Sequence, residues 1–291
     1  MILFIGEILA DVVMDAASGA MTAFIGGAPF NAAVSCARQG TETLFVGRVG
    51  DDPLGKFLKE RAKRFPVKSI VQTDRERPTT VAFVSIDEHG ERDFKFLRHD
   101  SADDAIELDA RLFEENKISY VHIGSLMLSS PKGRKLALDA IAAAEKAGAY
   151  VSFDVNFRAD IFRDKEEALA AYRPLVERAD VVKFGEEEVE YFYGESYESA
   201  VKKMNNPLVV VTLGKEGCWV KKAGANALMV PSKPVKPVDT TGAGDAFYGA
   251  FIANLDGKKP TGVTAEDLRA IAEKANDAGC RATLHKGAIE E

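Results

Sequence analysis

The sequence Val238-Asp-Thr-Thr-Gly-Ala-Gly-Asp-Ala-Phe247 is the most informative stretch of this 291-residue chain. An extended, proline-punctuated run, 231–237, precedes it. After it, Phe247, Phe251 and Leu255 recur four residues apart, which places them on one face of an α-helix. The pattern therefore predicts a glycine-rich turn that leads from an extended segment into a helix.

This glycine-rich turn has the composition of an anion site. Gly242, Ala243 and Gly244 carry almost no side chain, so their backbone N–H groups are accessible where the helix is expected to begin. Accessible N–H groups at the positive end of a helix dipole bind phosphate. Asp245 follows directly, and a carboxylate beside a phosphate can accept the proton of an attacking hydroxyl group. The alternative is a structural turn in which Asp245 caps the helix.

The seven residues from Asp239 to Asp245 resemble the C-terminal signature of the ribokinase-like (PfkB-type) carbohydrate kinases. The resemblance implies that Asp245 is the catalytic base. It also implies that the backbone amides of Gly242, Ala243 and Gly244 form the anion hole, with Gly242 and Gly244 in contact with ATP.

Two segments near the N-terminus carry the same resemblance. The apolar run 2–5 predicts a buried first strand, and Asp11 follows it at the edge where open α/β sheets bind ligands. Gly26-Gly-Ala-Pro-Phe-Asn31 predicts a helix start and resembles the N-terminal signature of the family. The residues alone also allow a solvated aspartate and a plain helix start. The resemblance implies that Asp11, Gly26, Gly27 and Asn31 bind the sugar.

Composition argues against several classes of protein. Hydrophobic residues make up 46% of the chain, which is enough for a large core, and the net charge is −7. That charge argues against nucleic acid and against an anionic membrane as partners. The cysteines at 36, 218 and 280 are far apart and form no disulfide framework, so we expect a reducing, cytoplasmic setting. No apolar run is long enough to span a membrane.

Between Pro78 and Arg98 the hydrophobic period changes to two, which predicts a β-hairpin with its turn at 87–91. We expect a small β-sheet lid formed by about 10–24 and 68–99, inserted in a single domain that spans the whole chain. The resemblance implies that this lid covers the sugar, and closure would keep water from the reacting phosphate. Arg98 is expected to point into the cleft and bind substrate, and a surface arginine is the alternative. A homodimer through the lid strands is a further expectation.

From residue 120 the chain alternates strands and helices. We expect strands over 120–128 and 149–155, joined by a helix over 131–147 that ends at a glycine. Asp154-Val-Asn-Phe-Arg158 lies at the end of the second strand and resembles a motif of fructokinase-like members of the family. Asn156 and Arg158 are thereby implied on the substrate or phosphate side of the cleft, and a structural Asp–Arg pair is the alternative.

The family resemblance also points to a nucleotide site in the second half of the chain. Lys183 is expected near the phosphates of ATP. Glu188 aligns with the glutamate of the family's N-x-x-E motif, which acts on magnesium through water, although Gly185 stands where the family has asparagine. A structural role for the acidic residues at this helix start is the alternative.

In the turn Thr212-Leu-Gly-Lys-Glu-Gly217, the resemblance implies that Thr212, Gly214 and Gly217 bind ATP. A turn of this kind is also common without any ligand. Asn276, in a helix expected from 264 to 279, is implied in the adenine pocket. Asp239 and Thr241, with the loop 283–287, are implied to hold potassium. The ATP-binding candidates in this half of the chain are therefore Lys183, Glu188, Thr212, Gly214, Gly217, Gly242, Gly244 and Asn276.

Repeated strand–helix–strand units predict a parallel sheet covered on both faces, a three-layer α/β/α, Rossmann-like core of the ribokinase type with a small β-sheet lid. The implied reaction is the transfer of the γ-phosphate of ATP, with Mg²⁺ and potassium as cofactors, to a primary hydroxyl group of a sugar. The motifs at 6–7, 26–29, 90–94 and 156–158 look most like those of fructokinases.

Two alternatives to a fructose kinase stay open. Ribose, 2-keto-3-deoxygluconate or a ribonucleoside could replace fructose, because specificity among these substrates rests on a few hydroxyl contacts. A non-catalytic sugar- or nucleotide-binding module is the alternative class. A Rossmann dehydrogenase fits poorly, since no G-x-G-x-x-G follows the first strand.

Overall fold

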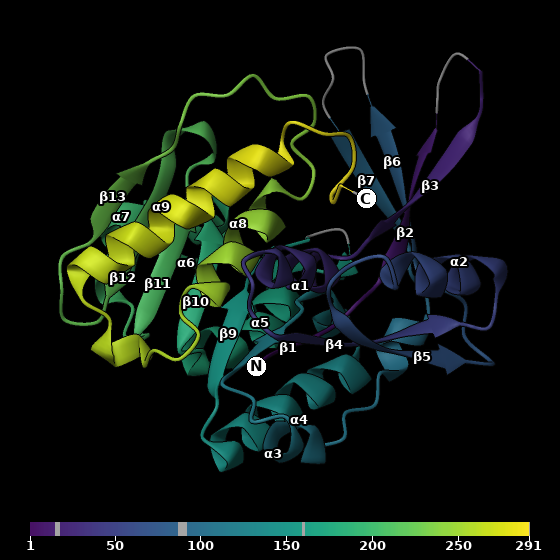
Figure 1. Ribbon diagram of the computed structural model, residues 1–291, viewed down its shortest axis with the longest axis horizontal. Coiled ribbons are helices and arrows are strands. Elements are labelled where there is room, and N and C mark those ends of the chain that lie inside the picture. Colours follow the sequence, from purple (N-terminus) through teal and green to yellow (C-terminus); the bar gives the residue numbers. More distant parts are fainter. Residues whose placement is uncertain (15–17, 87–91, 159–160, 291) are drawn as a thin grey trace.

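The computed structural model describes residues 1–14, 18–86, 92–158 and 161–290, which form two β-sheets and their covering helices (Figure 1). The predicted turn at 87–91 lies outside these residues. In spatial order, the large sheet contains β13 (Leu228–Pro231), β12 (Gly217–Lys222), β11 (Leu208–Thr212), β10 (Val181–Gly185), β9 (Tyr150–Asp154), β8 (Tyr120–Ile123), β1 (Ile2–Ile5), β4 (Thr43–Gly50) and β5 (Lys68–Asp74).

The large sheet is parallel from β11 to β5, and near its other edge β12 pairs antiparallel with both β11 and β13. Both faces of the sheet are buried, which explains why the sequence of the first strand is apolar throughout. Ile2 and Phe4 belong to the core on one face, whereas Leu3 and Ile5 belong to the core on the other. Successive side chains of a strand point to opposite faces, so a strand between two cores needs a continuous apolar run.

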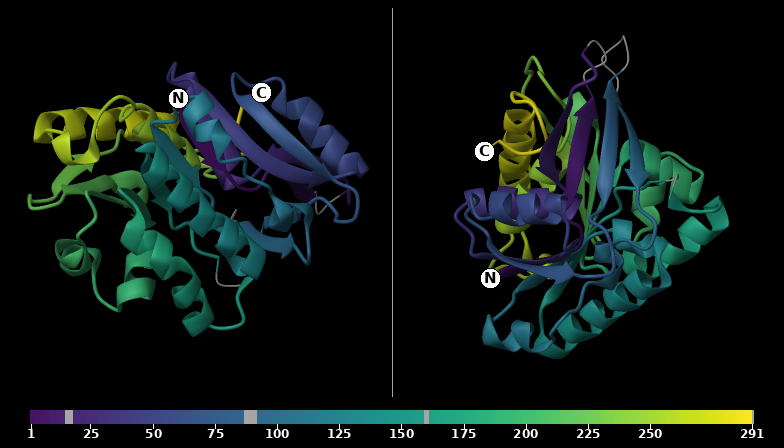
Figure 2. Two further views of the ribbon diagram at one scale, coloured as in Figure 1. Left: turned by 90° about the horizontal axis from the view of Figure 1, so that it is seen from below. Right: turned by 90° about the vertical axis from the view of Figure 1, so that its right-hand side faces the viewer.

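Helices cover both faces of the sheet, so the predicted three-layer fold is confirmed (Figure 2). One face carries α1 (Ala28–Arg38), α2 (Pro53–Ala62), α8 (Ala243–Ala253) and α9 (Ala265–Ala282). The opposite face carries α3 (Arg111–Glu115), α4 (Pro131–Ala147), α5 (Lys165–Arg178), α6 (Glu186–Tyr193) and α7 (Tyr197–Lys203). No helix in the described part of the chain is both long and apolar enough to cross a membrane.

The small sheet stands apart from the core, with strand order β3-β2-β6-β7 (Figure 1). Its strands are β2 (Leu9–Met14), β3 (Met21–Gly26), β6 (Val81–Ile86) and β7 (Arg92–Leu97). The N-terminal segment pairs with the hairpin through the parallel strands β2 and β6, as the sequence predicted. The segment 68–74 does not join this sheet. It is β5, which pairs in parallel with β4 in the large sheet.

The predicted strand over 120–128 is also shorter than expected. It ends at Ile123, and Leu126–Ser129 form a 3₁₀ turn. At Gly124 the chain passes Pro29 so closely that a Cβ atom there would lie 3.0 Å from the proline Cγ. Glycine at this position avoids a tight contact with the start of α1, and beyond it Leu126 packs against Leu9 and Ala82 of the small sheet.

Helices α1 and α8 pack directly on each other. A Cβ atom at Gly249 would lie 2.1 Å from the carbonyl oxygen of Ala32, so only glycine permits this approach. The hydroxyl group of Ser35 donates a hydrogen bond of 2.6 Å to the carbonyl oxygen of Ala246, which joins the helices one turn further along. This packing fixes the first turn of α8 relative to the first turn of α1.

We predict that Gly249→Ala destabilises the protein by about 2 kcal/mol, because the added methyl group meets backbone atoms that cannot rotate away. Denaturant unfolding would measure the change in the free energy of unfolding. Gly262→Ala is the matched control, since its Cβ would lie 3.7 Å from the nearest atom, in ordinary contact. Equal stability of both variants would contradict the close approach of the two helices.

Candidate active site

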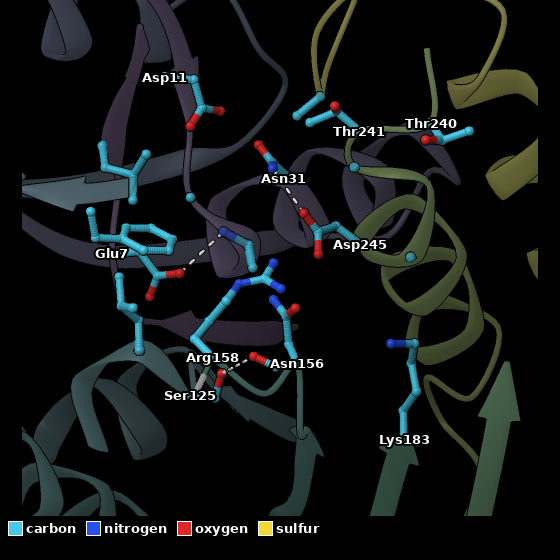
Figure 3. A pocket seen from close by; sticks show the side chains of 18 residues that line it. Glu7, Asp11, Asn31, Ser125, Asn156, Arg158, Lys183, Thr240, Thr241 and Asp245 are labelled. Carbon is cyan, nitrogen blue, oxygen red and sulfur yellow. Dashed lines mark hydrogen bonds between the residues drawn. The ribbon is translucent and has the colours of Figure 1, made fainter. Parts of the chain in front are cut away.

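A cavity of about 580 Å³ lies between the small sheet and the carboxyl ends of the central strands (Figure 3). The start of α1 contributes Asn31, and the start of α8 contributes Gly242, Gly244 and Asp245. The other polar side chains that line it are Glu7, Asp11, Ser125, Asn156, Arg158, Lys183, Thr240 and Thr241. The cavity thus unites residues from both signature segments.

The start of α8 has the geometry of an anion site, with one correction to the prediction. Gly242 is the N-cap, with φ 74°, and a Cβ atom there would lie 2.6 Å from the carbonyl oxygen of Ala288. Only glycine fits this position. The amide of Ala243 donates to the carbonyl oxygen of Thr240 at 3.2 Å, so it is used by the turn itself. Among the described contacts, the amides of Gly242 and Gly244 have no protein acceptor and point out of the helix start.

Asp245 lies in the first turn of α8 and faces the cavity. The side-chain amide of Asn31 donates to its Oδ2 atom at 2.9 Å (Figure 3). Burial raises the pKa of the Asp245 carboxyl group, while the bond from Asn31 and the positive charges of Lys183 and Arg158 act in the opposite direction. A carboxylate with a raised pKa accepts a proton more readily than a solvent-exposed one does.

Lys183 forms a buried ion pair beside Asp245. Its Nζ atom lies 2.8 and 2.9 Å from the two carboxylate oxygens of Asp154, and both side chains are less than one-tenth exposed. Burial alone would lower the pKa of Lys183, but the carboxylates of Asp154 and Glu188 outweigh it and the net shift is upward. The lysine is therefore charged, and it lines the cavity close to Gly244.

The predicted sugar-side residues of the N-terminal half also meet here. Asp11, on β2 of the small sheet, lines the cavity. Gly26 leaves room for it, because a Cβ atom at Gly26 would lie 2.1 Å from the Oδ2 atom of Asp11. Gly27 has φ 110° and a Cβ there would lie 2.4 Å from the carbonyl oxygen of Glu7. Both glycines are therefore required for these close approaches.

Arg98 does not lie where the sequence suggested. Its guanidinium group is paired with Asp103 at 2.8 Å and Asp104 at 2.5 Å, and it also contacts the hydroxyl group of Ser129. The side chain is only 4% exposed and is absent from the cavity lining. We therefore assign Arg98 to the scaffold, in contrast to both the expected substrate contact and the surface alternative. Arg158, by contrast, extends toward Asp245 (Figure 3).

A second cavity, of about 650 Å³, lies on the other side of the start of α8. Thr240 and Gly244 line both cavities, so the two spaces meet there. The amide nitrogen of Asn276 donates to the carbonyl oxygens of Val230 and Pro231, at 3.0 and 3.3 Å, so this side chain also fixes the end of β13. The predicted nucleotide-side residues that line the second cavity are Thr212, Gly214, Gly217, Gly244 and Asn276.

Glu188 lies at the start of α6 and outside both cavities. Its two carboxylate oxygens accept hydrogen bonds of 2.6 Å from the backbone amides of Phe157 and Gly185. These contacts tie α6 to the segment that carries Arg158. They give Glu188 a structural role, and its role toward magnesium stays a prediction.

Asp239 and Thr241 lie side by side before α8. The carboxylate of Asp239 accepts hydrogen bonds from the amides of Thr241 and Gly287, at 2.9 and 2.7 Å. The hydroxyl oxygen of Thr241 is buried and forms no hydrogen bond with a described residue. A buried oxygen without a hydrogen-bond partner beside a carboxylate is compatible with a cation site, and the role of these two residues toward potassium stays a prediction.

The sequence analysis did not select Glu7, Ser125, Thr240 and Ala288, all of which line the first cavity. Glu7 lies two residues after the end of the first strand, and that position was a usable signal. Ser125 was assigned to the interior of a strand that in fact ends at Ile123. Ala288 reaches the cavity only because the last loop of the chain folds back over the start of α8, which no local pattern indicates.

Comparisons with known proteins agree with this geometry. The family model of the pfkB family carbohydrate kinases matches residues 1–291. A fructokinase of Vibrio alginolyticus is 35% identical over 289 residues, covering 96% of this chain and 92% of the relative. The chain therefore belongs to the pfkB family of carbohydrate kinases.

Two solved structures share the fold over almost the whole chain. A fructokinase from Vibrio cholerae O395, with fructose, ADP and calcium ion bound, is 34% identical with a TM-score of 0.86, covering 99% of this chain and 94% of that one. A fructokinase from Xylella fastidiosa with bound ATP is 27% identical with a TM-score of 0.89, covering 99% and 93%.

We predict that Asp154→Ala lowers the free energy of unfolding by about 3–5 kcal/mol, because Lys183 is then left as a buried charge without its partner. Chemical denaturation would measure the loss. Asp139→Ala is the control, since the Lys135–Asp139 pair is solvent-exposed on α4 and contributes little. If the two variants lost equal stability, the buried ion pair would not have the assigned role.

Proposed function

We propose that this chain transfers the γ-phosphate of ATP to the primary hydroxyl group of fructose, giving fructose 6-phosphate. The position of Asp245 supports this reaction best. It lies at the start of α8, beside uncovered amides, where a polar cavity meets a second cavity. The fructokinases similar to this chain support fructose as the sugar.

In this proposal the sugar occupies the first cavity, where Asp11, Gly27 and Asn31 select its hydroxyl groups. Asp245 accepts the proton of the attacking hydroxyl group, and Asn31 holds the carboxylate in place through its hydrogen bond. Gly26 acts indirectly, by making room for Asp11.

ATP occupies the second cavity in this proposal, with its γ-phosphate at the start of α8. The amides of Gly242 and Gly244 and the positive charges of Lys183 and Arg158 stabilise the transferred phosphoryl group. The adenosine part of ATP is then held by Thr212, Gly214, Gly217 and Asn276.

Two cations complete the proposal. Magnesium enters with ATP and neutralises charge between its phosphates. Potassium is held by Asp239, the hydroxyl oxygen of Thr241 and the 283–287 loop, where it would support the loop that carries the anion site.

The remaining proposals concern the whole molecule. We propose a single domain that spans 1–291 and acts in the cytoplasm, where the free thiol groups of its three cysteines stay reduced. A homodimer would form through the small sheet, where Met14, Met21 and Leu97 are between 47% and 61% exposed.

We predict that Asp245→Asn lowers kcat by about 10²- to 10⁴-fold, because asparagine keeps the shape of the side chain but cannot accept the proton. The wild-type rate should also fall as the pH decreases through the raised pKa of Asp245, because the protonated acid cannot act as a base. ADP release measures both effects, and calorimetric binding of ATP to the variant controls for folding. If the Asp245→Asn variant kept nearly wild-type turnover, Asp245 would not be the catalytic base.

We further predict that fructose gives the highest kcat/KM in a panel with ribose, 2-keto-3-deoxygluconate and a ribonucleoside. Each assay would contain ATP, Mg²⁺ and potassium, and chelation of Mg²⁺ should abolish ADP release. A higher kcat/KM for another sugar would keep the mechanism and replace the substrate. No release with any sugar would favour a non-catalytic binding module.

A further inference from the structure

Glu7 has an unusual environment for a carboxyl group. It lies two residues after the end of β1, lines the first cavity and is only 4% exposed. Its Oε1 atom accepts a hydrogen bond of 3.2 Å from the backbone amide of Ala28, the first residue of α1 (Figure 3). Helix α1 has glycine as its N-cap, no side-chain cap and no acidic residue in its first turn. Glu7 therefore supplies, from another element, the cap that this helix lacks.

The second oxygen of Glu7 has no such partner. Oε2 is buried and forms no hydrogen bond with any described residue. It lies beside Gly124, where a Cβ atom would approach it to 3.1 Å. A buried carboxylate normally needs hydrogen bonds to both oxygens or a positive partner, and an oxygen without them favours the neutral acid.

The surroundings of Glu7 act in the same direction. The pKa of Glu7 is raised to about 8, with burial as the largest cause. The negative charges of Asp103 and Asp245 contribute to this rise, while a backbone hydrogen bond and the positive charge of Arg98 oppose it. Arg98 is itself paired with Asp103 and Asp104, so its charge is largely shared with other carboxylates.

We propose that Glu7 is a positioning residue for phosphoryl transfer, acting as a neutral carboxylic acid that fixes the start of α1 and thereby the Asn31–Asp245 hydrogen bond. The inference rests on the proposed kinase function. Asn31 lies three residues after Ala28, within the first turn that Glu7 caps. A shift of that turn would move Asn31 away from Asp245, the group that must meet the sugar hydroxyl.

Ionisation of Glu7 would oppose the reaction. It would add a negative charge to a cavity that already contains Asp245, at the site where a negatively charged phosphoryl group must arrive. We therefore expect the wild-type kcat/KM to fall as the pH rises above about 8.

The test compares Glu7→Gln and Glu7→Ala with the wild type on the best sugar of the panel. Glutamine can accept the bond from Ala28 and place a neutral group at Oε2, but it cannot ionise. Alanine should lower kcat by about 10- to 100-fold, because a small misplacement of a reacting group is costly. Glutamine should restore most of that activity and abolish the alkaline decrease, while the acidic decrease due to Asp245 remains. Glu42→Gln, at an exposed carboxylate, should keep the wild-type profile.

A second measurement tests Glu7 without activity. A carboxyl group with a raised folded pKa contributes stability that is fully present below its unfolded pKa of about 4.5 and is lost as the pH rises through about 8. The Tm of the wild type should therefore fall relative to that of Glu7→Gln between about pH 5 and about pH 9.

Two results would overturn the inference. One is a folded Glu7→Gln variant that is as inactive as Glu7→Ala, because the ionised form would then be required. The other is a Tm difference between wild type and Glu7→Gln that does not change with pH. If the wild type phosphorylates no sugar, the proposed function fails, and the Tm comparison still decides the protonation state of Glu7.

Discussion

The contact between helices α1 and α8 is the constraint on which the active site depends. Each helix starts with one of the signature segments, and the two starts must meet with sub-ångström accuracy for Asn31 to reach Asp245. The absence of a side chain at Gly249 lets the two backbones approach. The bond from Ser35 to the carbonyl oxygen of Ala246 fixes their relative position along the axes. A packing contact in the core thus sets the geometry of a polar site at the edge of the sheet.

Charge balance is the second constraint, because this site must accept a highly charged nucleotide without exposing it to water. The buried carboxyl groups of Glu7 and Asp154 and the half-buried one of Asp245 would repel phosphate if all were ionised and unpaired. Lys183 neutralises Asp154, and burial favours the neutral form of Glu7. Asp245 is then the carboxylate that remains available to accept a proton. The free energy of assembling these buried groups is offset by the apolar cores on both faces of the sheet.

The sequence was sufficient for features that are local along the chain. The turn that ends in Asp245, the apolar first strand and the period of two in the hairpin each depend on neighbouring residues. Prediction from the sequence failed where a pairing depends on how the chain turns or on a distant strand. Arg98 was assigned to substrate because no periodic pattern indicates the turn that places Asp103 and Asp104, five and six residues further on, beside its guanidinium group. Segment 68–74 was placed in the lid because nothing in its sequence identifies β4 as its partner.

The active site lies between two parts of the fold, the small sheet and the core. The small sheet supplies Asp11 from its own strands, whereas the core supplies Asp245. The segment from Gly26 to Asn31 connects these two parts, because it leaves the small sheet as β3 and enters the core as α1. A sugar bound to Asp11 and Asp245 would therefore join both ends of one short, continuous segment. Because Glu7 caps that segment at its centre, its carboxyl group is well placed to couple sugar binding to the position of the catalytic base.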